Sequence, residues 1–323
     1  MNTLKDISKE ILKSKQIGIT YHASPDGDAV GSALALLNGL KALNKDAYLI
    51  SRDVIPENLQ YLKGAEEATG KLNTPLEDTD TIVVVDCGSY ERISANIEDY
   101  KGKIINVDHH ITNDIYGQKN YIDIKASATA EIIYELLLEM GFEFKEDENS
   151  VNIGTCLYTG LVTDTGSFKY SNVTERTHKI ASMLIKIGVN NTKIHQNLFE
   201  NKSFEQIKFI GKVLNNVELL FDKKISLIKI PLKFGEELGT DIGDTADIIA
   251  SALQIKGVEI AILIKETENG SKISLRSKNF FDVREIAERL GGGGHIKAAG
   301  ITLKNICLDE AEDLVLNEIE KEF

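Results

Sequence analysis

Residues 81–86 read Thr-Ile-Val-Val-Val-Asp, a run of β-branched residues that ends in a carboxylate. Such a run is typical of a strand that is buried on both faces of a sheet. The N-terminal half contains further strand-like segments at 17–21, 47–51 and 103–107. It also contains segments that look helical, at 29–43, 129–140 and 151–162. Strands that alternate with helices indicate βαβ units, so we predict an α/β domain with a mainly parallel sheet flanked by helices.

The C-terminal part has a different pattern. The asparagine-rich residues 188–203 are polar and predict a linker, and an amphipathic helix is expected at about 204–220. Shorter runs follow it: strand-like at 225–230, 259–264 and 272–276, and helical at 245–253 and 283–290. We therefore expect a first domain at 1–187, a linker with a connecting helix at 188–222, and a smaller α/β domain with a mixed sheet at 223–323.

Composition limits the classes of protein to consider. No run approaches the roughly 18 apolar residues that a membrane span needs, and residues 1–15 lack the apolar core of a signal peptide, so we expect a cytoplasmic protein without a membrane partner. The three cysteines lie far apart, which argues against a disulfide framework or a structural zinc site. A net charge of −13 disfavours binding to long duplexes, and a small polyanion fits better.

Four short segments carry carboxylates and imidazoles after predicted strands and after one helix. Taken singly, the first, second and fourth segments are also explained by a turn or a helix cap, whereas two adjacent buried histidines each need a partner. In parallel sheets, however, ligands bind at the carboxyl ends of the strands, so we expect the four segments to converge. Their side chains are His22, Asp26 and Asp28 in one turn, Asp86 alone, Asp108, His109 and His110 in one triplet, and Asp164.

This convergence predicts a metal centre. Carboxylates that lie together raise each other's pKa values, and divalent cations relieve that repulsion. Mixed imidazole and carboxylate ligands suit manganese better than calcium, with magnesium as the alternative. Two cations about 3.5–4 Å apart would activate water for in-line attack on phosphorus. The cluster is therefore interpreted as a catalytic site with two divalent cations.

These motifs resemble the signature of the DHH phosphoesterase superfamily, and the resemblance covers nearly the whole chain. It implies that Asp86 is a ligand shared by both manganese ions and that His110 faces the substrate phosphate. Asn113, close behind the triplet, is a further candidate for substrate contact. The remaining implied ligands are His22 and Asp26 for one ion, and Asp28, His109 and Asp164 for the other.

A second group of candidate residues lies near the C-terminus. Four consecutive glycines leave the backbone free to wrap an oxyanion with its N–H groups, and an arginine grips phosphate in a bidentate way. A loop without any ligand is the alternative explanation of the glycines. The run resembles the DHHA1 domain that accompanies one branch of the superfamily. The predicted substrate-binding residues are Arg276, Gly292, Gly293, Gly294 and His295.

The sequence therefore predicts an enzyme, a phosphoric ester hydrolase with its active-site cleft between the two domains. The resemblance implies manganese-dependent hydrolysis of short RNA or DNA oligonucleotides to mononucleotides. It also implies dephosphorylation to AMP of pAp, which is adenosine with phosphates at both sugar ends. One alternative is a phosphodiesterase for cyclic di-AMP or pApA, which would share every metal ligand. The other is an RNA-binding or regulatory protein with structural metals. Association into a homodimer is left open.

Overall fold

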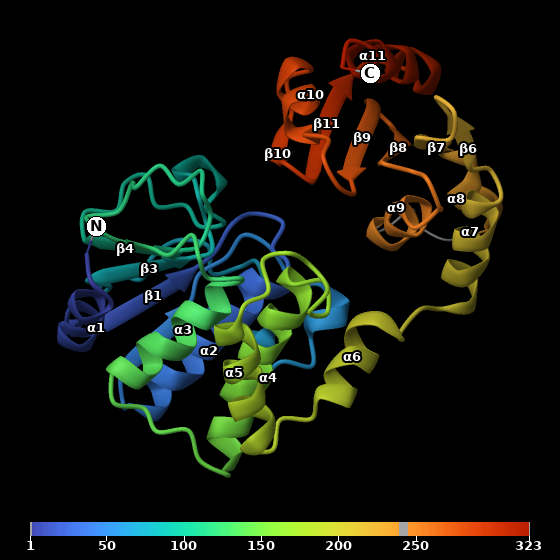
Figure 1. Ribbon diagram of the computed structural model, residues 1–323. Coiled ribbons are helices and arrows are strands. Elements are labelled where there is room, and N and C mark those ends of the chain that lie inside the picture. The colour runs from blue at the N-terminus through green and yellow to red at the C-terminus, as the bar shows by residue number, and fades with distance from the viewer. Residues whose placement is uncertain (1, 239–244, 323) are drawn as a thin grey trace. The chain divides into compact units, whose positions relative to one another are not determined.

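The computed structural model describes residues 2–238 and 245–322 (Figure 1). The chain forms two compact units, Met1–Asn201 and Lys202–Phe323. None of the helices in the described residues is long and apolar enough to cross a membrane.

The first unit is built on a five-stranded sheet in which all neighbouring strands run parallel, as predicted. The strand order is β2-β1-β3-β4-β5, so the chain starts near the middle and winds outward in both directions. The strands are β1 (Gln16–Thr20), β2 (Asp46–Leu49), β3 (Thr81–Val85), β4 (Lys103–Asp108) and β5 (Lys119–Ile122). Strand β3 matches the predicted bounds, and all five of its residues are buried.

Both faces of this sheet are covered, which explains the continuous β-branched run of β3. Val83 and Val85 face the larger core, where the sheet packs against helices, and Ile82 and Val84 face a smaller core on the other side. Figure 1 shows the helices α2, α3 and α4 together on one side of β1, β3 and β4. The helices are α1 (Leu4–Lys13), α2 (Gly27–Ala42), α3 (Thr129–Glu139), α4 (Glu148–Asp164) and α5 (Glu175–Lys186). Three short 3-10 helices lie in the loops: η1 (Glu57–Leu59), η2 (Ala65–Glu67) and η3 (Tyr90–Arg92).

The prediction of a linker at 188–203 was wrong, because this stretch contains the helix α6 (Asn191–Phe199). Asn190 caps the helix by accepting a hydrogen bond from the N–H of Lys193 at 3.0 Å. Ile194 is 1% exposed in the core of the first unit, and Leu198 packs against the same core. Three of the asparagines that indicated a linker therefore belong to this helix: Asn190 caps it, and Asn191 and Asn197 lie within it.

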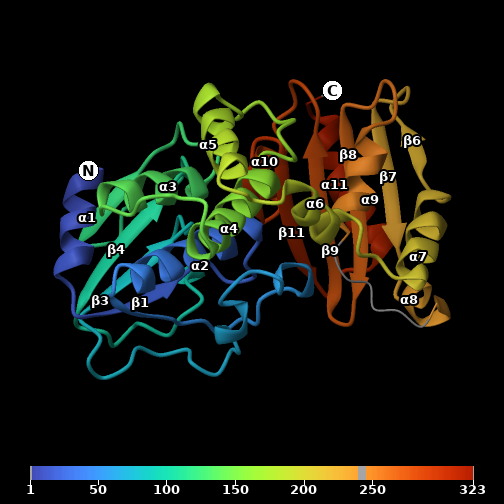
Figure 2. The ribbon, with the colours of Figure 1, turned by 90° about the horizontal axis from the view of Figure 1, so that it is seen from below.

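The second unit contains a six-stranded mixed sheet, as predicted, with the order β10-β11-β9-β8-β7-β6. Only β7 and β8 pair in parallel among these strands. Figure 2 shows α9 on one face of the sheet and α11 on the other. The strands are β6 (Glu218–Leu220), β7 (Ile225–Ile230), β8 (Ile260–Thr267), β9 (Gly270–Ser277), β10 (Gly293–His295) and β11 (Ala298–Lys304). The helices are α7 (Phe204–Leu214), α8 (Lys233–Leu238), α9 (Ala246–Leu253), α10 (Val283–Arg289) and α11 (Leu308–Glu320).

The connecting helix predicted at 204–220 is shorter than expected. Helix α7 ends at Leu214, and residues 218–220 form β6, which pairs antiparallel with β7. The apolar residues at the end of the predicted helix satisfy their backbone groups in the sheet instead.

Candidate active site

The turn after β1 places the side chains of His22 and Asp26 near Asp86. Asp26 caps α2 by accepting hydrogen bonds from the N–H groups of Asp28 and Ala29 at 3.0 and 3.1 Å. The Nδ1 atom of His22 lies 3.0 Å from the carbonyl oxygen of Ala23, so it carries the proton of the neutral ring. The Nε2 atom of His22 then points its lone pair between Asp26 Oδ2 at 3.9 Å and Asp86 Oδ2 at 3.7 Å.

Asp86 lies at the centre of the cluster in an unusual backbone conformation. Its φ angle of 53° lies in the left-handed region, which is sparsely populated by residues other than glycine and is common at functional sites. The N–H of Asp86 donates to the carbonyl oxygen of Val107 at 3.0 Å, which ties the turn after β3 to β4. While Oδ2 of Asp86 faces His22, its Oδ1 faces His109 Nε2 at 3.6 Å.

Asp28, in the first turn of α2, is fully buried and contacts the beginning of α3. Its Oδ2 accepts a hydrogen bond from the N–H of Thr129 at 2.6 Å, and its Oδ1 accepts one from the N–H of Ala130 at 2.9 Å. The residue before the helix, Ala128, makes no side-chain cap, so Asp28 satisfies helix N–H groups that would otherwise lack a partner. The positive end of the helix dipole favours a carboxylate at this position.

His109 completes the other side of the cluster. Its Nδ1 lies 3.2 Å from the carbonyl oxygen of Ala126, and its Nε2 lies 3.3 Å from Oδ2 of Asp164, the last residue of α4. His22 and His109 thus share one arrangement, in which Nδ1 contacts a backbone carbonyl and Nε2 faces carboxylates. This arrangement is typical of histidines that bind metal through Nε2.

Three sets of ligand atoms are present. Within each set the atoms lie within 4.8 Å of one another, and the sets share members. Burial and the neighbouring carboxylates raise the pKa of Asp28 to about 8, and the same causes raise the pKa values of Asp86 and Asp164 to about 7. Carboxylates in such surroundings require either protons or cations, and imidazole nitrogens are also at hand, so the donors fit divalent metal ions. The sets are His22, Asp26 and Asp86; Asp28, His109 and Asp164; and Asp86, His109 and His110.

His110 belongs both to the third set of ligand atoms and to a chain of hydrogen bonds. Burial opposes its positive charge, but the hydrogen bond from His110 Nδ1 to Asp108 Oδ1 at 2.7 Å and the nearby Asp86 raise the pKa of His110 to about 9. Asp108 also accepts a hydrogen bond from Asn113 Nδ2 at 2.6 Å. The side-chain oxygen of Asn113 accepts one from the N–H of Ile115, so both ends of this amide have partners within the protein.

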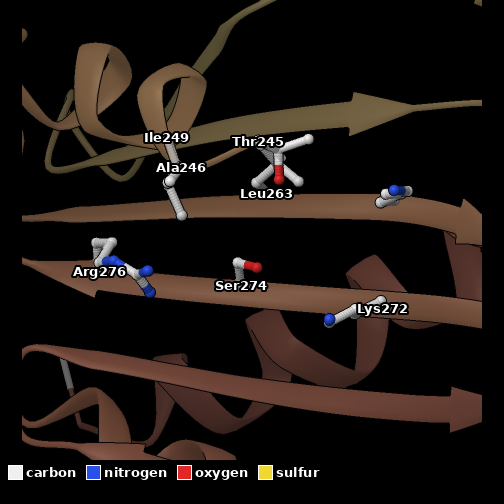
Figure 3. A pocket seen from close by; sticks show the side chains of 8 residues that line it. Thr245, Ala246, Ile249, Leu263, Lys272, Ser274 and Arg276 are labelled. Carbon is white, nitrogen blue, oxygen red and sulfur yellow. The ribbon is translucent and has the colours of Figure 1, made fainter. Parts of the chain in front are cut away.

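The second unit carries a cationic hollow on one face of its sheet. Lys272, Ser274 and Arg276 alternate along β9 and share this face, and the antiparallel register places Ala298 of β11 and then His295 of β10 beside Arg276. Figure 3 shows the three β9 side chains in a row below α9. The hollow is completed by Thr245, Ala246, Ile249, Leu263 and Lys265.

The four glycines do not form the open loop that the sequence predicted. Gly291, with a φ angle of 78°, follows α10, and the N–H groups of Gly291 and Gly292 donate to the carbonyl oxygens of Glu288 and Ala287. Gly293 and Gly294 lie in β10, where they pair with β11. A Cβ atom at Gly292 would lie 2.2 Å from the carbonyl oxygen of Gly300. At least two of the predicted N–H donors are therefore used within the domain.

Comparison with known proteins agrees with this geometry. Residues 16–161 match the model of the DHH family, N-terminal domain, and residues 229–323 match the DHHA1 domain. The chain belongs to the DHH family. It is 33% identical to the bifunctional oligoribonuclease and PAP phosphatase NrnA of Thermus thermophilus over 97% of this chain and 93% of that protein. The protein of the same name from Bacillus subtilis is 29% identical, over 93% of this chain and 92% of that protein.

A crystal structure supports the same assignment. An exopolyphosphatase-related protein from Bacteroides fragilis superposes with a TM-score of 0.90 at 26% identity, covering 98% of this chain and 95% of that one. DHH proteins are phosphoesterases that use divalent metal ions, so this DHH chain is an enzyme that hydrolyses phosphoric esters.

Sequence reasoning missed residues that form hydrogen bonds with the candidate metal ligands of this DHH domain. Thr129 contacts both Asp28 and Asp86, and Ala126 contacts His109 through its carbonyl oxygen. In the second unit, it missed Lys265, which lies opposite Lys272 in the β8–β9 pair, and Thr245, which lines the same hollow. The only sequence signal for the first pair is the lack of a capping side chain at the start of α3.

Proposed function

We propose that this DHH enzyme is a manganese-dependent phosphoesterase that hydrolyses short oligonucleotides to mononucleotides and dephosphorylates pAp to AMP. The observation that carries the proposal is the carboxylate of Asp86, whose two oxygens face two different sets of ligand atoms. Support for the substrates comes from the two similar proteins, whose names state oligoribonuclease and PAP phosphatase activities.

Two divalent cations fit these donors, apart from His110, when Asp86 is shared. One would be held by His22, Asp26 and Asp86, and the other by Asp28, Asp86, His109 and Asp164. When bound, such cations lower the pKa of water and neutralise charge on a phosphoryl group. The mixture of imidazole nitrogens and carboxylate oxygens favours manganese over magnesium, which prefers oxygen ligands and keeps several waters.

His110 is proposed to stabilise charge on the phosphoryl oxygens. Its Nδ1 donates a hydrogen bond to Asp108 Oδ1 at 2.7 Å, and this neighbouring carboxylate raises the pKa of His110 and favours the protonated ring. The Nε2–H group is then a charged donor whose direction is set by the bond on the other nitrogen. A donor that is already oriented before the reaction stabilises developing charge at little cost in reorganisation. Asn113 is proposed to hold Asp108 in position for this role, and its predicted contact with substrate stays a prediction.

The hollow in the DHHA1 domain is proposed to bind a second phosphate of the substrate. Arg276 would grip two phosphate oxygens through its planar guanidinium group, and Lys272 would add positive charge. Gly293 and His295 lie on the same face by register, and small residues there leave room for a sugar–phosphate backbone. A compact cationic site in a chain of net charge −13 favours short substrates over long duplexes.

The test is turnover of pAp, a dinucleotide, a pentanucleotide and cyclic di-AMP, measured side by side with and without manganese. We expect manganese-dependent hydrolysis of the linear dinucleotide and of pAp, with slower turnover of the cyclic compound. Asp86→Ala is expected to lose this activity, whereas Asp147→Asn, which alters the cap of α4 away from the cluster, is expected to keep it. Manganese-dependent hydrolysis that is unchanged in Asp86→Ala would overturn the proposal. Faster turnover of cyclic di-AMP would favour the cyclic-dinucleotide alternative.

A further inference from the structure

Thr129 is the first residue of α3, and its side chain is fully buried. It makes one hydrogen bond from its backbone and another from its side chain. The N–H donates to Asp28 Oδ2 at 2.6 Å, and the hydroxyl group donates to Asp86 Oδ1 at 2.9 Å. These two carboxylates belong to different sets of ligand atoms, so one residue connects both sets.

We infer that Thr129 is a positioning residue that sets the orientation of the Asp86 carboxylate, and thereby the affinity of the protein for divalent cations. This inference rests on the cation site proposed above. It is specific to the hydroxyl group, because the backbone N–H supports Asp28 whatever side chain residue 129 carries.

The hydroxyl group donates to Oδ1, the oxygen of Asp86 that also faces His109 and His110. Asp86 Oδ1 lies 3.6 Å from His109 Nε2 and 3.7 Å from His110 Nδ1, distances at which a direct hydrogen bond does not form. The hydroxyl group of Thr129, at 2.9 Å, is therefore within hydrogen-bonding distance of this oxygen, whereas the two imidazole nitrogens are not. It opposes rotation of the carboxylate about its Cβ–Cγ bond, which would move both oxygens away from their two sets of partners.

Thr129 itself is held firmly. The carbonyl oxygen of Ala126, three residues earlier, accepts from His109, and Ser127 Oγ contacts both Glu131 of α3 and Thr177 of α5. The start of α3 is thus tied to the sheet, to its own next turn and to a neighbouring helix. When a contact that supports a metal ligand is removed, the metal affinity or the activity of the site typically falls by about 10–100-fold.

The experiment is a calorimetric titration of the metal-free full-length protein with MnCl2. Thr129→Val keeps the shape of the side chain and the backbone N–H but removes the hydroxyl group. We expect its manganese affinity to fall by about 10–100-fold relative to the natural protein. Thr129→Ser restores the hydroxyl group and is expected to restore the affinity. Thermal unfolding of each metal-free variant reports separately on the fold.

The matched control is Thr159→Val, which removes an equally buried hydroxyl group that donates to Thr155 and contacts Tyr61 but no metal ligand. It is expected to bind manganese as the natural protein does. Equal affinities in Thr129→Val and the natural protein would overturn the inference, as would an equal loss in Thr159→Val. If Thr129→Val does not fold, Thr129→Ala provides the same comparison without added bulk. If the natural protein itself binds no manganese, the proposed cation site fails first, which distinguishes the two failures.

Discussion

Gly160→Ala tests whether the close packing of α4 against α2 and α3 holds a metal ligand in place. A Cβ atom at Gly160 would lie 2.6 Å from Asp28 Oδ1 and 2.8 Å from the Cβ atom of Ala130. The first distance is about 0.8 Å shorter than the 3.4 Å at which ordinary van der Waals contact begins. Neither neighbour is the end of a long flexible side chain, because Asp28 is fixed by two N–H groups and Ala130 lies in a helix.

The magnitude follows from two opposing terms. Overpacking of a core costs typically 1–3 kcal/mol, and replacing a glycine inside a helix with alanine stabilises the helix by up to about 1 kcal/mol. We therefore expect Gly160→Ala to lower the free energy of unfolding by about 1–2 kcal/mol. In a domain of this size that corresponds to a fall in Tm of roughly 2–8 °C. Because Asp28 must shift, manganese affinity is expected to fall as well.

Thermal unfolding and calorimetric titration with MnCl2 measure the two effects. The matched control is Gly154→Ala in the same helix, whose new Cβ atom would lie 2.8 Å from Val189 Cγ2, the end of an apolar side chain. We expect this control to change stability without changing manganese affinity. If Gly160→Ala binds manganese as tightly as the natural protein and keeps its Tm, close packing does not position Asp28 and the reasoning is refuted.

Three further predictions test other parts of the structure. Ile194→Ala is expected to lower the free energy of unfolding of the first unit by about 2–4 kcal/mol, measured by urea unfolding, because the side chain is 1% exposed. The same substitution in a solvated linker would leave this free energy almost unchanged. At pH 8 a thiol reagent should modify only Cys307 rapidly, since burial raises the pKa of Cys87 to about 11 and that of Cys156 to about 12, so both remain protonated; rapid labelling of three thiols in the folded protein would contradict this. Gly293→Ala has no atom within 4 Å of the new Cβ, so it should preserve Tm but raise the KM for a dinucleotide if substrate lies on this face, and an unchanged KM would argue against that face.

The strands β1 to β4 of the parallel sheet were predictable because each is specified by a short local pattern of residues. The run of β3 is β-branched because both faces of the sheet are covered, so its bounds follow from the sequence alone. That the candidate metal ligands lie close together was predictable for a related reason, since parallel strands bring their carboxyl ends to one edge. Helix α6 was missed because its buried residues are few: Ile194 and Leu198 were outweighed by asparagines. The close packing at Gly292 was not predictable, because its new Cβ atom would meet the carbonyl oxygen of Gly300, which only the folded domain brings near; the predicted contact of the glycines with substrate stays a prediction.

The contacts that support the metal ligands lie beyond what local patterns reveal. Asp28 and Thr129 are 101 residues apart in the chain, and their contact exists only because α3 packs beside α2. A physical requirement nevertheless points toward it. The first N–H groups of a helix need acceptors, α3 has no capping side chain of its own, and a buried carboxylate needs donors. One contact meets both needs, so the start of α3 and the position of Asp28 depend on each other. Cations that bind only the folded arrangement should therefore stabilise the packing of α3 as well as the ligands themselves.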